Sequence, residues 1–145
     1  MSDRHSKHQR LRVFISHSNV DQVFAGKMRN LLHHRANAQV FTADDLSAGE
    51  KWETKLRNEL SSADVVVALL SPNSVESSWV LQEIGAAWAL KKPIIPVVTR
   101  RDVLNKIPVS LEGAKVIELA DVESPENAEK FLGAFEKSMA PLHLA

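Results

Sequence analysis

The segment DVVVALL at residues 64–70, with SPNSVESSWVLQEIGAAWAL at residues 71–90 directly after it, decides the fold of this chain. Its first part is a run of β-branched and aliphatic residues, which is typical of a strand at the centre of a parallel sheet. From Trp79 onward the second part predicts a helix, because apolar residues recur at the spacing of one buried helical stripe. Those residues are Val80, Ile84, Ala87 and Trp88. The segment therefore predicts a buried strand that leads directly into an amphipathic helix.

One acidic residue, Glu83, lies in this apolar setting. Trp79 precedes it by four residues, so the carboxylate and the indole share one face at the start of the predicted helix. A carboxylate beside a large aromatic side chain, next to the end of a strand, is suited to an active site. A helical glutamate is also commonly solvated or paired with a lysine, so the segment by itself leaves both interpretations open.

Strand and helix patterns alternate along the rest of the chain. Apolar runs predict four further strands, at residues 12–16, 39–42, 94–98 and 115–119. Helical spacing of apolar residues predicts three more helices, within residues 21–37, 52–60 and 124–139. This alternation predicts an α/β fold: a flavodoxin-like three-layer arrangement with a five-stranded parallel sheet, in the order 2-1-3-4-5, and helices on both faces.

That strand order places a ligand crevice where the chain reverses direction, outside the carboxyl ends of the first and third strands. Two predicted turns border the crevice and supply its candidate polar contacts: Ser16, His17, Ser18 and Ser71. Ser18 and Asp21 have the spacing of a helix capping box, and the amides of this helix start are candidates to face a phosphate. The third strand leads directly to Glu83, so the fold moves this glutamate to the rim of the expected pocket.

Length and composition bound the class of protein. A chain of 145 residues is the usual size of one domain, and we expect a disordered tail at residues 1–10, a domain at 11–140 and a second tail at 141–145. The 18 acidic residues balance 18 basic ones, so the net charge gives no indication of nucleic-acid or membrane binding. The absence of cysteine excludes disulfides and fits a reducing compartment. The polar start resembles neither a signal peptide nor a membrane span, so a cytoplasmic location is expected.

Three segments, taken in order, resemble the TIR domain, the module of Toll/interleukin-1 receptors and resistance proteins. They are VFISHSNVD at residues 13–21, FTADDLSAGEKW at 41–52 and LLSPNSVESSWVLQEIGAA at 69–87, followed by KPIIPV at 92–97. The match spans nearly the whole chain from Arg12, and the order and spacing of the segments are more specific than any one of them. The resemblance implies a flavodoxin-like sheet, and for many bacterial, plant and animal members it implies cleavage of NAD.

In those members the catalytic glutamate lies on the third helix, four residues after a Trp or Cys. Residues 77–83 here read SSWVLQE, so the resemblance assigns the catalytic role to Glu83. The loop that ends at Trp52 resembles the mobile BB loop of the family, which contributes to self-association and to the lip of the site. On this basis the further candidate substrate contacts are Asp45, Gly49 and Trp52. After the first strand, where some members have an aromatic residue and basic residues, this chain has His17 and Ser18.

Cleavage of NAD is within the reach of a single carboxylate. Nicotinamide leaves from a cationic pyridinium as a neutral molecule, so no general acid is required, in contrast to an ordinary glycosidase. One ionised glutamate can stabilise an oxocarbenium-like ribose in a desolvated pocket, and Trp79 is suited to wall that pocket or to stack on a ring. NAD is then a substrate, and neither a cofactor nor a metal is expected. The adjacent His33 and His34 lack metal-ligand spacing.

Two other functions fit the same residues. One is a TIR interaction module that only self-associates or recruits another TIR protein. The other is a nucleoside or nucleotide N-glycosidase or deoxyribosyltransferase, which uses a similar sheet and glutamate. Three residues also have structural roles to be tested: Trp52 as core rather than substrate contact, Trp88 as core, and Gly85 as a site of close packing between its helix and the sheet.

Overall fold

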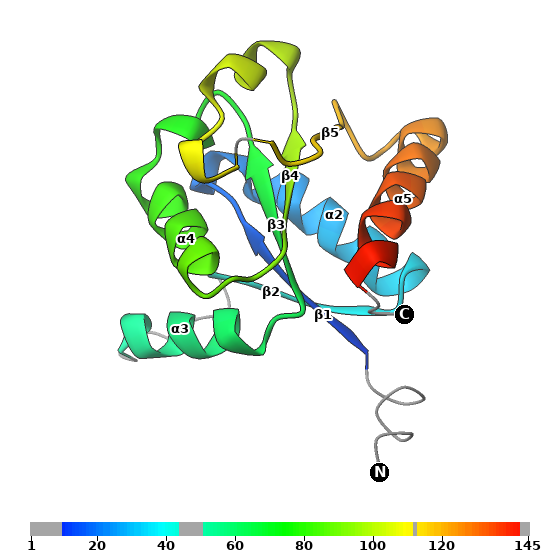
Figure 1. Cartoon of the computed structure of the whole chain (residues 1–145). Coiled ribbons are helices and arrows are strands. Elements are labelled where there is room, and N and C mark those ends of the chain that lie inside the picture. Colours follow the sequence, from blue (N-terminus) through cyan, green and yellow to red (C-terminus); the bar gives the residue numbers. More distant parts are fainter. Residues whose placement is uncertain (1–9, 44–50, 112, 143–145) are drawn as a thin grey trace.

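The computed structural model describes residues 10–43, 51–111 and 113–142 (Figure 1). The centre of this part of the chain is a parallel sheet of five strands: β1 (Leu11–Ser16), β2 (Ala38–Thr42), β3 (Val65–Leu70), β4 (Ile94–Val98) and β5 (Ile117–Glu118). The strand order is β2-β1-β3-β4-β5, and every neighbouring pair is parallel. The predicted fold class and strand order are confirmed, although β5 is shorter than the predicted residues 115–119.

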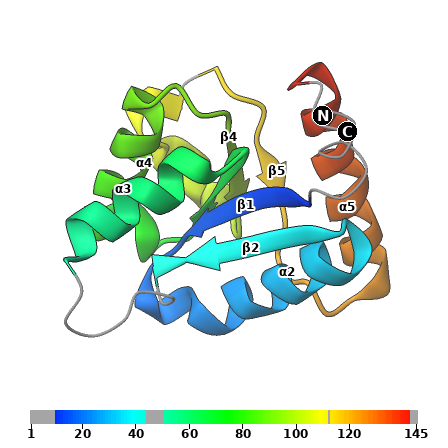
Figure 2. The same ribbon diagram turned by 90° about the horizontal axis from the view of Figure 1, so that it is seen from below.

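Helices connect the strands and cover both faces of the sheet. The α-helices are α2 (Gln22–Arg35), α3 (Trp52–Ser62), α4 (Ser78–Ala89) and α5 (Pro125–Met139), and the short 3₁₀-helices are η1 (Asn19–Asp21), η3 (Ser74–Glu76), η4 (Arg101–Lys106), η5 (Val109–Leu111) and η6 (Ala140–Leu142). α2 and α5 lie on one face, and α3 and α4 lie on the other (Figures 1 and 2). Within the described residues, no helix is long and apolar enough to cross a bilayer.

The core explains why β3 is the central strand. All six of its residues are buried, because helices pack on both faces of the sheet at this point. On one face its side chains pack with Met28 of α2 and with Phe131 and Phe135 of α5. On the other face, two smaller apolar clusters form beneath α3 and α4. Burial on both faces is what the β-branched run of residues 65–70 predicts.

The start of α4 is set by a side-chain cap. Ser77 Oγ accepts a 3.3 Å hydrogen bond from the backbone N–H of Val80, so the helix begins at Ser78, one residue before the predicted start.

The capping box predicted for Ser18 and Asp21 is wrong. Ser18 Oγ donates a 2.8 Å hydrogen bond to the Asp21 carboxylate, and neither side chain caps the backbone of the helix that follows.

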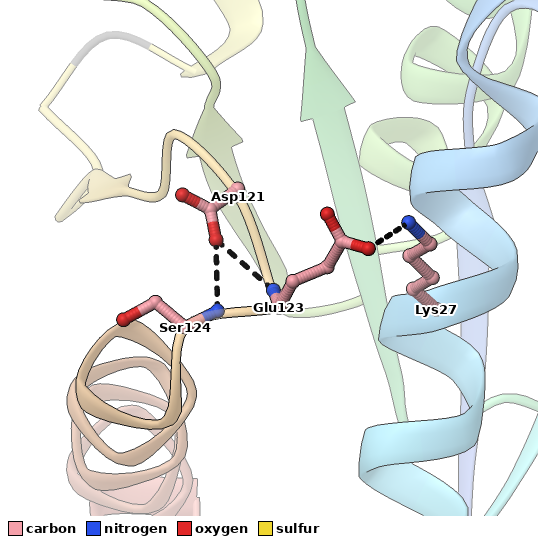
Figure 3. Close-up of polar contacts among 4 residues, drawn as sticks. All are labelled: Lys27, Asp121, Glu123 and Ser124. Carbon is pink, nitrogen blue, oxygen red and sulfur yellow. Dashed lines mark hydrogen bonds and ion pairs between the residues drawn. The ribbon is translucent and has the colours of Figure 1, made fainter.

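The start of α5 is held by a local network around Asp121 (Figure 3). Oδ1 of Asp121 accepts hydrogen bonds from the backbone N–H groups of Glu123 and Ser124, both 3.0 Å long. Oδ2 accepts a 3.1 Å hydrogen bond from the side chain of Asn127. The backbone N–H of Ser124 is the main cause that holds the pKa of Asp121 below its usual range. Glu123 forms a 2.7 Å ion pair with Lys27, which links this turn to α2.

Two predictions for α4 are wrong. Trp88 is 61% exposed rather than part of the core. Trp88 is eight positions after the buried Val80, and eight residues bring a helix about 80° beyond two full turns. The side chain of Trp88 therefore points beside the stripe that faces the sheet. The buried residues of the helix are Val80, Glu83, Ile84 and Ala87. Gly85 does not permit close packing on the sheet either, because no neighbouring atom of the described residues lies within 4 Å of the position that a Cβ would take.

Candidate functional site

The carboxyl ends of β1 and β3 lie side by side, because Ser16 at the end of β1 is in register with Ala68 of β3. β3 continues through η3 into α4, which runs back along one face of the sheet (Figure 1). Polar residues leave both strands at the same edge, and α4 passes beside them. This junction is the place where the strand order predicts a ligand crevice.

Glu83 of α4 is buried at this junction, with 1% of its surface exposed. Ser16 Oγ donates a 2.6 Å hydrogen bond to its Oε1. The helix holds Glu83 at this depth because Val80 and Ile84, on either side of it, are packed against the sheet. A buried carboxylate costs free energy unless it is hydrogen-bonded, and apolar packing at such a position is often equally stable. The Ser16–Glu83 contact is therefore an unusual feature for a position chosen by stability alone.

A second carboxylate, that of Asp21, joins the two loops of the crevice. Its Oδ2 accepts hydrogen bonds from Ser18 Oγ at 2.8 Å and from Ser71 Oγ at 2.5 Å. Ser18 follows β1 and Ser71 follows β3, so one carboxylate oxygen ties together the turns after both strands. Ser71 and Ser74 close the second turn, because the N–H of each donates to the Oγ of the other, at 2.7 and 3.1 Å.

His17 is 7% exposed and is held by the backbone of its own turn. Its Nδ1 lies 2.8 Å from the carbonyl oxygen of Ser18. Since a carbonyl oxygen only accepts, this contact assigns the ring proton to Nδ1. The imidazole is therefore held in a fixed position in the turn after β1.

The structure brings together five of the residues predicted for the site, and all five are buried: Ser16, His17, Ser18, Ser71 and Glu83. Trp79 is half-buried and packs against the apolar cluster around Phe14, so it belongs partly to the core beneath α3. Trp52 is the first residue of α3, and its side chain is outside what the structure describes. Asp45 and Gly49 lie outside the described residues.

The two neighbouring histidines of α2 lie away from the crevice. His33 and His34 are exposed, and their rings meet edge to face with centroids 4.8 Å apart. Arg10 Nη2 contacts His33 Nδ1 at 2.5 Å, so His33 is engaged with the start of β1. In the part of the chain that the structure describes, no three histidine or acidic side chains gather as metal ligands.

The sequence interpretation missed the role of Asp21. It treated this residue only as part of a helix start, because Ser18 lies three positions before it. Asp21 and Ser71 are 50 positions apart, and no local pattern connects them. The predicted strand order was the usable signal, since it brings the turns after β1 and β3 to one crevice and therefore makes their polar side chains neighbours.

Comparison with known proteins gives a family and a fold. A family model described as the TIR domain matches residues 13–132. The comparison with curated proteins found no match.

Among solved structures, the chain is similar to the TIR domain of the Toll-related receptor TRR-2 from Hydra magnipapillata, at 15% identity and a TM-score of 0.69 over 87% of this chain and 96% of that one. It is similar to the TIR domains of the activated Roq1 resistosome, at 15% identity and a TM-score of 0.66 over 88% and 98%. It is also similar to the CMP N-glycosidase BcmB of Clostridium botulinum, at 14% identity and a TM-score of 0.56 over 86% and 98%. Structural similarity at such identities establishes the fold alone.

Proposed function

The chain belongs to the TIR domain family, since the family model matches residues 13–132, and we propose that it is an NAD nucleosidase. The proposed reaction cleaves the bond between nicotinamide and ribose. Its products are nicotinamide and either ADP-ribose or a cyclic ADP-ribose, in signalling or immune defence. The observation that carries the proposal is the buried hydrogen bond between Ser16 Oγ and Glu83 Oε1, 2.6 Å long, at the carboxyl ends of β1 and β3.

The chemistry needs one well-held carboxylate. The bond between ribose C1′ and the pyridinium nitrogen breaks, and its electron pair goes to nicotinamide, which leaves as a neutral molecule. The positive charge that develops on the ribose is stabilised by the ionised Glu83. Water adds its oxygen to C1′ and loses a proton when the product is ADP-ribose. An adenine nitrogen or a ribose hydroxyl takes the place of water when the product is cyclic.

In this proposal Ser16 is a positioning residue for Glu83. Its hydroxyl donates to Oε1 and so fixes the orientation of the carboxylate toward the crevice. His17, Ser18, Ser71 and Trp79 remain candidate substrate contacts, together with Asp45, Gly49 and Trp52. The Asp21 carboxylate supports this assignment for the two crevice turns, because it holds Ser18 and Ser71 in one arrangement. NAD is the proposed substrate, and the proposal requires no cofactor.

The test is chromatography of NAD after prolonged incubation with the protein at high concentration. We expect nicotinamide to accumulate with time, and the second product peak distinguishes hydrolysis from cyclisation. Ser16→Ala should slow the release roughly 10- to 100-fold, because the carboxylate loses its fixed orientation. Ser138→Ala is the matched control, since Ser138 of α5 donates only to the carbonyl of Ala134 in its own helix, at 3.0 Å, and it should leave the rate unchanged. No release of nicotinamide by the folded protein contradicts the proposal.

A substrate panel separates the alternative functions. The structural similarity to a CMP N-glycosidase makes CMP and deoxynucleosides the first comparison substrates. Release of cytosine from CMP, without release of nicotinamide from NAD, would favour a nucleotide N-glycosidase. If the protein cleaves none of these substrates but binds a second TIR domain, the result would favour an interaction module.

We also propose that activity depends on assembly. The Roq1 TIR domains belong to an activated resistosome, which is the comparison that supports this proposal. Initial rates of nicotinamide release per mole of protein should rise with protein concentration, because a transiently competent site is populated more fully when copies associate. Constant specific activity from a monomer across the whole range would contradict it. The loop expected at the lip of the site lies largely outside the described residues.

A further inference from the structure

A cavity of about 340 Å³ lies between α2 and β2, near the amino ends of β1 and β2. β2 is the edge strand of the sheet and lies beside α2 (Figure 2). A volume of this size is within the range of small-molecule sites. Three parts of the chain line the cavity: Arg10, which directly precedes β1; Arg29, Asn30 and His33 of α2; and Gln39, Val40 and Phe41 of β2.

The polar part of this lining consists of hydrogen-bond donors. Arg10 and Arg29 contribute guanidinium groups, His33 contributes an imidazole, and Asn30 and Gln39 contribute amides. Among the described residues, no carboxylate lines the cavity. Guanidinium groups gathered in a cavity without an acidic side chain attract anions, and their planar donors fit the oxygens of carboxylates and phosphates.

Arg10 is held in place but is not fully hydrogen-bonded. Its Nη2 donates a 2.9 Å hydrogen bond to the carbonyl oxygen of Ala38, at the start of β2. In the described part of the chain, its Nε is buried and has no hydrogen-bond partner. A buried donor without an acceptor costs free energy, so folding alone does not explain this arrangement. An anion in the cavity would provide acceptor oxygens for this guanidinium.

His33 lies against the same guanidinium, because its Nδ1 is 2.5 Å from Arg10 Nη2. Since a guanidinium only donates, Nδ1 accepts and the ring proton is on Nε2. The 3.3 Å separation of Nδ1 from the Ala38 carbonyl oxygen is then a contact and not a hydrogen bond. An imidazole and a guanidinium can both carry positive charge, so a bound anion would favour their close approach.

The number of donor groups distinguishes a phosphate from a carboxylate. A carboxylate has two oxygens, and one guanidinium can pair with both of them. A phosphate monoester has three acceptor oxygens and nearly two negative charges, which match two guanidinium groups and an imidazole N–H. Val40 and Phe41 supply an apolar surface beside these donors. Arg12 lies over the ring of Phe41, 4.5 Å from its centroid, which leaves the rest of the ring for a ligand.

We propose that this cavity binds a soluble organic phosphate monoester. Arg10 and Arg29 pair with the phosphate oxygens, His33 donates from Nε2, and the organic group packs against Val40 and Phe41. The site is independent of the proposed NAD chemistry. Arg10 precedes the six residues of β1, and Ser16 is the last of them, so the two sites are about 20 Å apart along the strand.

Isothermal titration of the full chain with phenyl phosphate tests the proposal. We expect saturable binding to one site, and the affinity should exceed that of inorganic phosphate by about two- to tenfold, because the phenyl ring gains contact with Phe41. Acetate at the same ionic strength should bind more weakly than inorganic phosphate. Failure of both phosphates to bind, or an affinity for acetate equal to that for inorganic phosphate, overturns the proposal.

Variants place the binding in the cavity. Arg10→Gln and His33→Gln should each weaken phenyl phosphate binding, the first at least about tenfold, because a charge-assisted hydrogen bond is lost. Arg35→Gln is the matched control, since Arg35 is on the same helix but pairs with Glu129 at 2.7 Å and does not line the cavity. Equal weakening by all three variants would indicate general attraction to positive charge and would overturn the proposal. If Arg10→Gln does not fold, His33→Gln and Arg35→Gln decide.

A phosphate monoester also occurs as the headgroup of phosphatidic acid, so vesicles distinguish the two sources. Phosphatidylcholine vesicles that contain phosphatidic acid are sedimented with the full chain. We expect the protein to remain in the supernatant, because the proposed ligand is soluble and its organic group enters the cavity. Sedimentation with these vesicles, in a protein that does not bind phenyl phosphate, would contradict the proposal.

Discussion

Two carboxylate networks at the carboxyl edge of the sheet differ in where their partners come from. Asp121, after β5, takes its hydrogen bonds from Glu123, Ser124 and Asn127, which lie two, three and six positions further along the chain. At the ends of β1 and β3, Glu83 accepts a hydrogen bond from Ser16, which is 67 positions away in the sequence. Asp21 likewise accepts a hydrogen bond from Ser71, 50 positions away. The first network is local and half-exposed, whereas the second crosses the fold and lies largely inside it.

The difference separates folding from function. The Asp121 network is fully accounted for by the turn that starts α5, since short-range side-chain to backbone bonds favour such starts. Local folding does not explain the Ser16–Glu83 contact in the same way. Burying a carboxylate costs free energy, and two apolar side chains of similar shape at these positions are often equally stable. Residues that are costly for stability and geometrically fixed are the ones expected to serve an activity.

The largest expected effect is on activity and distinguishes the two networks directly. Glu83→Gln keeps the shape and removes the charge, so NAD cleavage should fall by at least about 10³-fold, because the lost charge acts chiefly in the transition state. Its melting temperature should stay near that of the wild type. Asp121→Asn is the matched change in the local network and should leave the initial rate of nicotinamide release unchanged. Full activity in the folded Glu83→Gln variant would rule out this mechanism.

The next effect compares two tryptophans of α4. Trp79 is half-buried against the cluster around Phe14, whereas Trp88 is exposed. Trp79→Ala should therefore lower the free energy of unfolding by about 2–3 kcal/mol, somewhat less than for a fully buried ring. Trp88→Ala, measured in dilute protein, should change it by less than about 0.5 kcal/mol. Urea denaturation of both variants measures these two changes. Equal decreases in the free energy of unfolding would contradict the burial described for the two tryptophans.

A smaller effect is the coupling between the two crevice turns. Asp21→Asn and Ser71→Ala each remove part of the hydrogen bond between Asp21 Oδ2 and Ser71 Oγ. A double-mutant cycle on the free energy of unfolding should give a coupling of about 1 kcal/mol. Asp121→Asn combined with Ser71→Ala is the control cycle and should be additive. Additivity in both cycles would mean that the carboxylate does not tie the turns together.

The smallest effect is a pH dependence of stability from Asp121. Its pKa is held below the ordinary value of an aspartate, first by the backbone N–H of Ser124, so the ionised form is favoured in the folded state. The stabilisation is complete above the unfolded-state pKa of about 3.9 and is lost as the pH falls through the lower folded-state pKa. The melting-temperature difference between wild type and Asp121→Asn should be small and constant near neutral pH and should shrink in acid. A difference that grows as the pH falls would contradict this assignment.

The elements that were predictable from sequence are those with a local pattern. The run at residues 65–70 is buried on both faces, as its β-branched composition predicts. The alternation of strands and helices was enough to predict the strand order, and the strand order placed Glu83 near the end of β1, where it accepts a hydrogen bond from Ser16. These features depend on periodicity and topology, which a single sequence carries.

The features that were not predictable depend on angles and on long-range register. Trp88 was assigned to the core because it continues an apolar pattern, but its direction on the helix takes it to the exposed flank. The hydrogen bond from Ser16 to Glu83 requires β1 and α4 to meet at one depth, which no local pattern specifies. The same is true of Asp21, whose spacing from Ser18 indicated a cap whereas its carboxylate accepts a bond from Ser71.

In the proposed function, the ribose of NAD binds against Glu83 at the carboxyl ends of β1 and β3. A crystal structure of the Glu83→Gln variant, soaked with NAD that it cannot cleave, tests this most directly. We expect intact NAD with the nicotinamide ribose C1′ in contact with the side chain at position 83 and with Ser16 still within hydrogen-bond distance of that side chain. NAD bound elsewhere on the folded variant, or an empty crevice at saturating NAD, would contradict it.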